Sequence, residues 1–240
     1  MAERVLIVNA DDFGLSPGVN AGVIRAYEQG ILTSASLMVR FPAAAEAADY
    51  ARAAPDLSLG LHVDLGEWTY NDGDWDTVYE VVSLDDPDVV IEEATRQIES
   101  FRRLTGQEPS HIDSHQHVHS WETVVQSFKT LARGLDVPLR HYTNGIAYCG
   151  DLYGQSTDGT PIPDAITVPA LVEIIKGLPS GVTELACHPG LGGDSGSTYD
   201  RERAQEVEIL CDPRVREALD REGVTLRSFT GMASDGAGER

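Results

Sequence analysis

Short apolar runs alternate with stretches of helical periodicity along most of the chain. Residues 5–8 are continuously apolar, which is typical of a parallel strand covered on both faces. Ser16 and Pro17 then form a helix start, and the helical spacing that follows stops at Gly30. The same strand–loop–helix pattern recurs. It predicts strands at 4–9, 33–39, 57–65, 110–114, 138–142, 182–187 and 224–229, and helices at 17–29, 43–54, 89–105, 121–133, 168–177 and within 201–222.

Seven strands that alternate with helices indicate an α/β fold with a parallel sheet. A closed TIM-like (β/α) barrel with seven or eight parallel strands and an open doubly wound sheet both fit, and the length of 240 residues favours the barrel. We expect a single domain over 1–231 and a frayed tail at 232–240. Two irregular stretches, 66–88 and 143–167, each follow a strand, so both should overhang the end of the barrel where active sites lie.

Charge and composition narrow the classes of partner. The 39 acidic residues against 18 basic ones give a net charge of −21, and such a surface repels phosphate backbones and anionic lipids. The apolar run near the start is too short for a membrane span, so we expect a cytoplasmic protein. Cys149, Cys187 and Cys211 form no CxxC pair, which argues against a disulfide framework or a thiolate zinc site.

Four of the seven histidines lie within nine residues. If the start of this run is extended, its period of two puts His111, Asp113 and His115 on one face, while His117 and His119 continue into the next loop. Imidazoles that converge at the carboxyl end of a strand suit a borderline divalent cation. The alternative is a solvated turn, or core histidines satisfied by hydrogen bonds.

Polar side chains also interrupt the ends of other apolar strands. Asp11 and Asp12 directly follow the first strand, where helix capping would explain them equally well in isolation. His62 lies inside an apolar strand, where an imidazole needs a metal or a hydrogen bond. His188 and Arg140 end two further strands. Capping does not predict that all of these residues fall on one side of the sheet, so we expect a functional site there.

Five segments, in order along the chain, carry a resemblance to a known family. They are residues 9–16 (NADDFGLS), 33–38 (TSASLM), 60–62 (GLH), 111–119 (HIDSHQHVH) and 187–190 (CHPG). Together they resemble the motifs of the YdjC-like carbohydrate deacetylases, which include chitooligosaccharide deacetylases, and residues 203–210 resemble the C-terminal helix of that family. The resemblance implies a divergent barrel related to polysaccharide deacetylases.

The resemblance also implies a metal site. Asp12, His62 and His115 match the residues that hold one divalent metal ion. Two imidazoles and a carboxylate admit zinc, and a carboxylate with waters admits magnesium. His117 and His119 are further candidates, either as alternative metal ligands or as groups that contact the substrate or support the site.

By the same resemblance, Asp11 is the general base and His188 the general acid, and Arg140 matches an arginine of the middle strand. Asp113 is expected to orient a histidine, with a local turn hydrogen bond as the alternative. The implied reaction is hydrolysis of the N-acetyl group of an amino sugar or short oligosaccharide, with release of acetate.

Aromatic residues in the two irregular stretches fit a sugar substrate, although they could simply cover the mouth of the barrel. They are Trp68, Tyr70, Trp75, Tyr148 and Tyr153. The expected partner is therefore a small N-acetylated sugar, and we expect neither nucleic acid nor a membrane. The sequence does not decide whether the protein forms a homodimer.

Two other functions compete with this interpretation. A metal-dependent phosphoesterase or amidohydrolase would also gather His and Asp at strand ends, but it usually carries an HxH pair on the first strand, where this chain has Asp11 and Asp12. A catalytically silent carbohydrate-binding or metal-binding module is the second alternative. Such a module needs neither the spare base Asp11 nor the acid His188.

Overall fold

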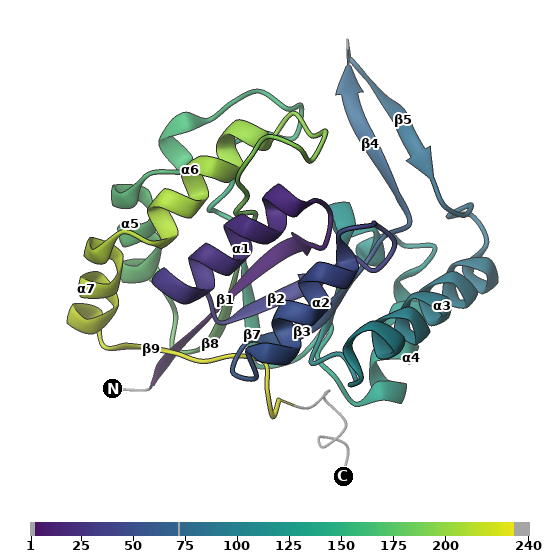
Figure 1. Ribbon diagram of the computed structural model, residues 1–240, viewed down its shortest axis with the longest axis horizontal. Helices are drawn as coiled ribbons and strands as arrows, with labels where there is room; N and C mark the ends of the chain where they lie inside the picture. The colour runs from purple at the N-terminus through teal and green to yellow at the C-terminus, as the bar shows by residue number, and fades with distance from the viewer. Residues whose placement is uncertain (1–2, 72, 233–240) are drawn as a thin grey trace.

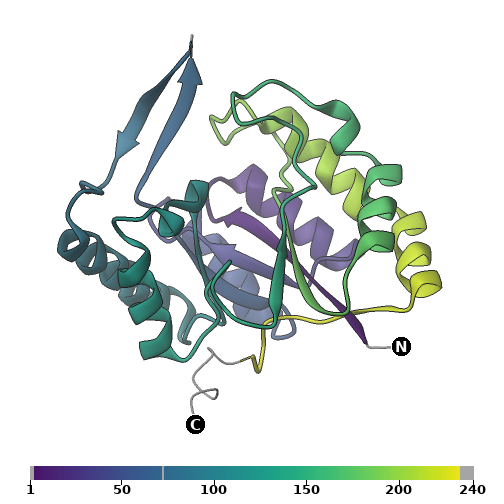
Figure 2. The same ribbon diagram turned by 180° about the vertical axis from the view of Figure 1, so that it is seen from behind.

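The computed structural model of the chain describes residues 3–71 and 73–232. Within them, seven parallel strands form one sheet that curves into a half-barrel, with helices on its outer side (Figures 1 and 2). The strand order is β6-β3-β2-β1-β8-β7, and β9 also pairs with β1. The α/β prediction is therefore confirmed, and the sheet has seven strands, although one of them lies elsewhere than predicted. The strands are β1 (Arg4–Phe13), β2 (Ser34–Leu37), β3 (Ser58–Val63), β6 (Ile112–Ser114), β7 (Ile146–Cys149), β8 (Gly181–Cys187) and β9 (Val224–Leu226).

β1 is the central strand. β8 pairs with it along one edge, while β9 and then β2 pair with successive parts of the other edge. Every residue of β1 after Arg4 is buried, which is why this segment reads as a continuous apolar run. The strand is longer than the expected 4–9, since it continues through Asp11 and Asp12 to Phe13.

Helices follow the strands much as the periodicity predicts. The α-helices are α1 (Pro17–Gln29), α2 (Ala44–Ala53), α3 (Pro87–Thr105), α4 (Val125–Leu135), α5 (Val168–Gly177), α6 (Asp200–Leu210) and α7 (Pro213–Glu222), and η1 (His115–Ser120) and η2 (Pro163–Ala165) are 3₁₀-helices. Ser16 caps α1, because its hydroxyl accepts a hydrogen bond from the backbone N–H of Val19 at 3.1 Å. None of the described helices is both long and apolar enough to cross a membrane.

The strand predicted at 138–142 is wrong. This segment makes one parallel bridge, between Leu139 and Ile112, and then turns. Pro138 has no backbone N–H to donate, and the N–H of Leu139 is taken by the hydroxyl of Thr143 at 2.8 Å. The positive φ of 68° at His141 then takes the chain out of extended geometry.

The two stretches predicted to be irregular contain strands. In the first, β4 (Gly66–Asn71) and β5 (Asp74–Glu80) form an antiparallel hairpin that projects from the body of the protein (Figure 1). The pairing of Tyr70 with Trp75 across the hairpin is the kind of aromatic contact that stabilises two adjacent strands. In the second stretch, β7 pairs with β8. The tail expected at 232–240 lies outside the described residues, except for Met232.

Candidate active site

The parallel register brings the polar strand ends together. Ala10 of β1 is paired with Cys187 of β8. The residue that follows each of them, Asp11 in β1 and His188 after β8, is therefore a neighbour of the other. Further along the sheet, beyond β2, His62 of β3 is paired with Asp113 of β6. The prediction that the polar residues at the carboxyl ends of the strands lie close together is therefore confirmed.

A β-bulge sets the positions of the two aspartates at the end of β1. Ala10 pairs with Ala35 and Phe13 pairs with Leu37, so β1 has one more residue than β2 in this interval. Asp12 adopts a left-handed backbone conformation with φ of 64°, which an L-residue other than asparagine or aspartate rarely adopts. Such local backbone strain is concentrated at functional sites.

Asp12, His62 and His115 gather around one carboxylate oxygen. Oδ1 of Asp12 lies 3.3 Å from Nε2 of His62 and 3.2 Å from Nδ1 of His115, while Oδ2 accepts a 2.6 Å hydrogen bond from Arg203. Burial opposes ionisation of Asp12, but the charge of Arg203 and the hydrogen bond to His115 outweigh it and hold the pKa of Asp12 well below 3.8. One donor atom of each residue lies within 4.8 Å of the others, so the three can hold a metal ion.

Asp113 fixes the ring of His62. Its Oδ1 lies 2.7 Å from Nδ1 of His62, and its Oδ2 accepts a 2.9 Å hydrogen bond from Ser36. Burial lowers the pKa of His62, but the Asp113 carboxylate more than compensates and raises it to about 10. The contact leaves Nε2 directed at Asp12, as in the carboxylate–histidine–metal arrangement of metalloenzymes.

Arg140 is the centre of a buried charge network. It donates hydrogen bonds to Asp11 at 2.6 and 2.7 Å and to Glu184 at 2.8 Å, and it pairs with Asp113 at 2.8 Å. Burial disfavours the charge of Asp11, yet Arg140 keeps the pKa of that carboxyl below 3.8. Burial raises the pKa of Glu184 to about 7 despite Arg140, because one guanidinium does not neutralise three carboxylates.

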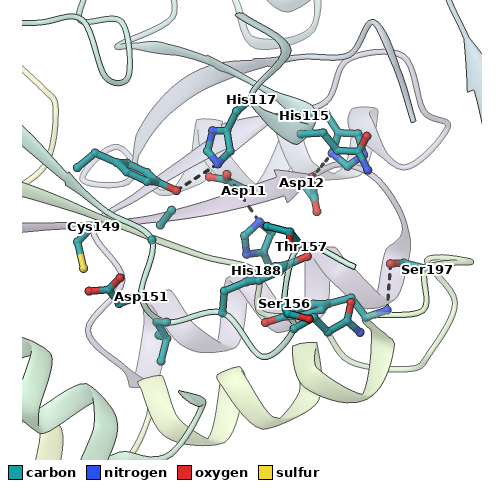
Figure 3. Close-up of a pocket in the computed structure, with 18 of the residues that line it drawn as sticks. Asp11, Asp12, His115, His117, Cys149, Asp151, Ser156, Thr157, His188 and Ser197 are labelled. Carbon is teal, nitrogen blue, oxygen red and sulfur yellow. Dashed lines mark hydrogen bonds and ion pairs between the residues drawn. The ribbon is translucent and has the colours of Figure 1, made fainter. Parts of the chain in front are cut away.

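His188 lies beside Asp11 (Figure 3). Its Nε2 is 3.8 Å from Oδ2 of Asp11, and its buried Nδ1 has no hydrogen-bond partner. Burial lowers the pKa of His188 to about 4, against the opposing effect of Asp11 and Asp12. The backbone N–H of His188 donates a 2.5 Å hydrogen bond to Glu206, which holds the end of β8 against α6.

The site opens into a cavity of about 1590 Å³. Asp11, Asp12, His62, His115 and His188 all line it. The five loop aromatics named from the sequence line it too, so their predicted place at the mouth is confirmed. Trp121, which the sequence did not single out, joins them, with its ring centroid 5.5 Å from that of Trp68.

The other histidines of the cluster separate. The expectation that His111, Asp113 and His115 lie on one strand is wrong, because β6 covers only Ile112–Ser114 and His115 begins η1. The ring of His111 is buried and stacks on Phe229 with centroids 3.9 Å apart. His117 lines the cavity, whereas His119 is fully buried outside the lining and hydrogen-bonded to Ser114.

Sequence reasoning missed four residues that hold the site. Arg203 and Glu206 come from α6, Glu184 from β8 and Ser36 from β2. Glu184 had a signal, because a charged residue inside an apolar strand must be paired or neutral. Arg203 lies in the segment 203–210 that resembles the family's C-terminal helix, but nothing there indicated a contact with the site, since an arginine on a helix is ordinarily a surface residue.

Comparisons with known proteins give matches over most of the chain. The family model described as "YdjC-like protein" matches residues 5–221. A carbohydrate deacetylase from Geobacillus stearothermophilus is 32% identical, over 94% of this chain and 97% of its own length. A chitooligosaccharide deacetylase from Serratia marcescens is 30% identical, over 95% of this chain and 98% of its own.

Solved structures show the same fold. A protein from Enterococcus faecalis V583, whose name assigns it to cellobiose-phosphate cleavage, superimposes with a TM-score of 0.78 at 27% identity, over 97% of this chain and all of the other. A polysaccharide deacetylase from Bacillus cereus superimposes with a TM-score of 0.57 at 10% identity, over 95% and 93% of the two chains. The expected relation to the polysaccharide deacetylase fold is therefore confirmed.

Proposed function

This chain belongs to the YdjC-like protein family, and we propose that it is a metal-dependent hydrolase that removes the acetyl group from an N-acetylated amino sugar or short oligosaccharide. One observation carries the proposal. An Asp–His–His group that can hold a metal lies beside a carboxylate and an imidazole at the wall of one large cavity. The names of the two deacetylase relatives support the same reaction.

The donor atoms of Asp12, His62 and His115 fit a divalent ion, either zinc or magnesium. Oδ1 of Asp12 faces one nitrogen of each imidazole, and Asp113 keeps the other nitrogen of His62 occupied. A metal bound by these atoms would supply a positive charge that activates water and polarises the acetyl carbonyl. Arg203 holds the second oxygen of Asp12 and so fixes the carboxylate in this orientation.

Asp11 accepts the proton of the attacking water in this proposal. Arg140 keeps Asp11 ionised near neutral pH and holds both of its oxygens in place. Attack of the water oxygen on the acetyl carbon then gives a tetrahedral intermediate, and the water proton moves to the Asp11 carboxylate.

His188 donates a proton to the amide nitrogen as its bond to the acetyl carbon breaks, which gives acetate and a free amine. With a pKa of about 4, the resting imidazole is neutral near pH 7, so it must gain this proton during turnover. Oδ2 of Asp11 lies 3.8 Å from Nε2 of His188, so a small movement of the imidazole brings the two atoms within hydrogen-bond distance, and Asp11 can then pass on the proton taken from water. The unpartnered Nδ1 leaves the ring free to reorient toward the substrate.

The walls of the cavity suit a neutral sugar. Trp75, Trp121 and Tyr153 line the cavity with 55%, 45% and 38% of their surface exposed, and aromatic faces of this kind bury the apolar face of a sugar ring. The volume of about 1590 Å³ exceeds the roughly 300–1,000 Å³ of typical small-molecule sites, which favours an oligosaccharide.

A phosphate ester is a poorer fit, although the structural neighbour from Enterococcus faecalis is named for cleavage of cellobiose phosphate. Among the residues that line the cavity, Arg203 is the one Lys or Arg side chain, and it is already paired with Asp12. A dianionic group would meet the carboxylates of the cavity wall, with no unpaired Lys or Arg side chain among the lining residues to help a metal bind it.

The proposal is tested by a substrate panel. Acetate release is measured on N-acetylglucosamine and its β-linked oligomers, and phosphate release on sugar monophosphates, each with added zinc or magnesium. We expect acetate from at least one acetylated sugar and no phosphate. Faster phosphate release than acetate release would favour the phosphoesterase alternative, and tight sugar binding with no product of either kind would favour a silent binding module.

A further inference from the structure

We infer that this chain has a second metal site, made of His117, His119 and His141, that binds a zinc-like transition-metal ion. The site does not depend on the proposed hydrolysis. His117 and His119 come from η1, and His141 follows the segment that pairs with β6 through Leu139. Two stretches about twenty residues apart in sequence thus place three imidazoles together.

The spacing of the rings matches shared coordination. Their centroids are 6.0 Å apart for His117 and His119, 5.1 Å for His117 and His141, and 5.7 Å for His119 and His141. Three imidazoles bound to one tetrahedral ion at a metal–nitrogen distance of ~2.05 Å have centroids ~5.2 Å apart. One nitrogen of each ring lies within 4.8 Å of the others, so small side-chain rotations complete the site.

Two of the three rings have an unused nitrogen. Nε2 of His119 and Nδ1 of His117 are both buried without a hydrogen-bond partner, and His119 has no exposed surface. An unsatisfied buried nitrogen is costly and calls for an explanation. In each ring the other nitrogen is anchored by an oxygen, from Ser114 at 2.7 Å for His119 and from Tyr148 at 3.2 Å for His117. Metal-binding histidines are usually held in this way.

This three-histidine site is separate from the Asp12 group. Figure 3 shows His115 beside Asp12 and His117 apart from both, with its Nε2 3.2 Å from the hydroxyl of Tyr148. The ring of His119 packs against Phe128 of α4, outside the cavity lining. His141 is exposed, so solvent reaches the site and can supply a fourth ligand.

The donor set selects the type of metal. Three imidazoles without a carboxylate suit zinc, nickel, cobalt or copper and not magnesium or calcium, which require oxygen ligands. The nearby cation Arg140 opposes a positive charge at these rings, but its ion pairs with Asp11, Asp113 and Glu184 offset part of that repulsion. A bound ion would join the turn that carries His115 to the segment that carries Arg140.

The test is metal stoichiometry on untagged protein, stripped with a chelator, reloaded with zinc and dialysed against excess magnesium, with zinc counted by mass spectrometry. If zinc fills both sites, the wild type holds two zinc ions per chain. If magnesium displaces the zinc of the Asp12 group, the wild type holds one. His141→Ala should lose one zinc relative to the wild type. His62→Ala, which damages the Asp12 group, should still hold one, and the double variant should hold none. Circular dichroism verifies that each variant is folded.

His188→Ala is the matched control, because it removes an imidazole from the same region but from neither ligand set, and it should bind as much zinc as the wild type. Cobalt substitution gives a second readout, since His62→Ala loaded with cobalt should show the visible absorption of a tetrahedral site and His62→Ala/His141→Ala should not. Equal zinc content in the wild type and His141→Ala, or no zinc in folded His62→Ala, would overturn the inference.

Discussion

Glu206 should make stability depend on pH, because it is a fully buried carboxyl with no cation paired to it. Its two oxygens accept hydrogen bonds from the backbone N–H of His188 at 2.5 Å and from the hydroxyl of Tyr199 at 2.7 Å. Burial outweighs these hydrogen bonds and raises the pKa of Glu206 from 4.5 to about 7. The folded state therefore binds this proton more tightly than the unfolded state does.

The sign and size of the effect follow from linkage. Stability from the protonated Glu206 is fully present below pH 4.5, falls between pH 4.5 and 7, and is lost above pH 7. The interval of about 2.5 pKa units corresponds to roughly 3 kcal/mol, since one unit is about 1.4 kcal/mol. Glu206→Gln mimics the neutral carboxyl at every pH, so it should remove this dependence of stability on pH.

Urea unfolding of the wild type and Glu206→Gln at pH 4.5 and pH 8 measures it. The difference in unfolding free energy between the two proteins should change by about 3 kcal/mol in favour of the variant as the pH rises. A constant cost of the amide cancels in this comparison. Glu217→Gln, on the exposed side of α7, controls for the removal of a carboxylate. A difference that stays constant with pH would refute the reasoning.

Three further predictions concern the site. Asp11→Asn and His188→Ala should each lose roughly 10²–10⁴-fold in amide turnover, but the His188 defect should shrink on a nitrophenyl acetate, whose leaving group needs no proton; equal losses on amide and ester would remove His188 as the acid. Asp113→Asn should weaken metal binding by roughly 10–100-fold in a competition titration, because it loosens the ring of His62; unchanged affinity would make Asp113 dispensable. Gly22→Ala should lower the free energy of unfolding, measured by urea denaturation, by roughly 1–3 kcal/mol, because an added Cβ would lie 2.3 Å from the Cα of Gly190 in the turn after His188. Wild-type stability of this variant would show that the turn can shift without cost.

The periodicity of the sequence predicts the central part of the fold well. β1 reads as a buried strand because both of its faces are covered, and α1 begins where Ser16 and Pro17 place it. Local signals fail where tertiary context decides. Residues 138–142 look like a strand by composition, yet Pro138 and the turn at His141 prevent pairing beyond Leu139.

Site prediction succeeds for residues at strand ends and fails for residues that support them from elsewhere. Asp12 and His62 stand out because polar groups interrupt apolar strands. Arg203 reaches Asp12 across 191 positions of sequence, and no local pattern predicts that contact, although 203–210 resembles a helix of the family. His141 lies within the strand predicted at 138–142, and nothing in the sequence marks it as a neighbour of His117, because that contact depends on how η1 turns after β6.

The central claim is that a metal at Asp12, His62 and His115 enables amide hydrolysis. The most direct measurement is acetate release from N-acetylated chitooligosaccharides by protein stripped of metal and then titrated with zinc or magnesium, in the wild type and in His62→Ala. We expect no acetate from the stripped wild type, recovery with added metal, and no recovery in folded His62→Ala. Acetate release at the wild-type rate by the stripped protein, or by His62→Ala, would contradict the account.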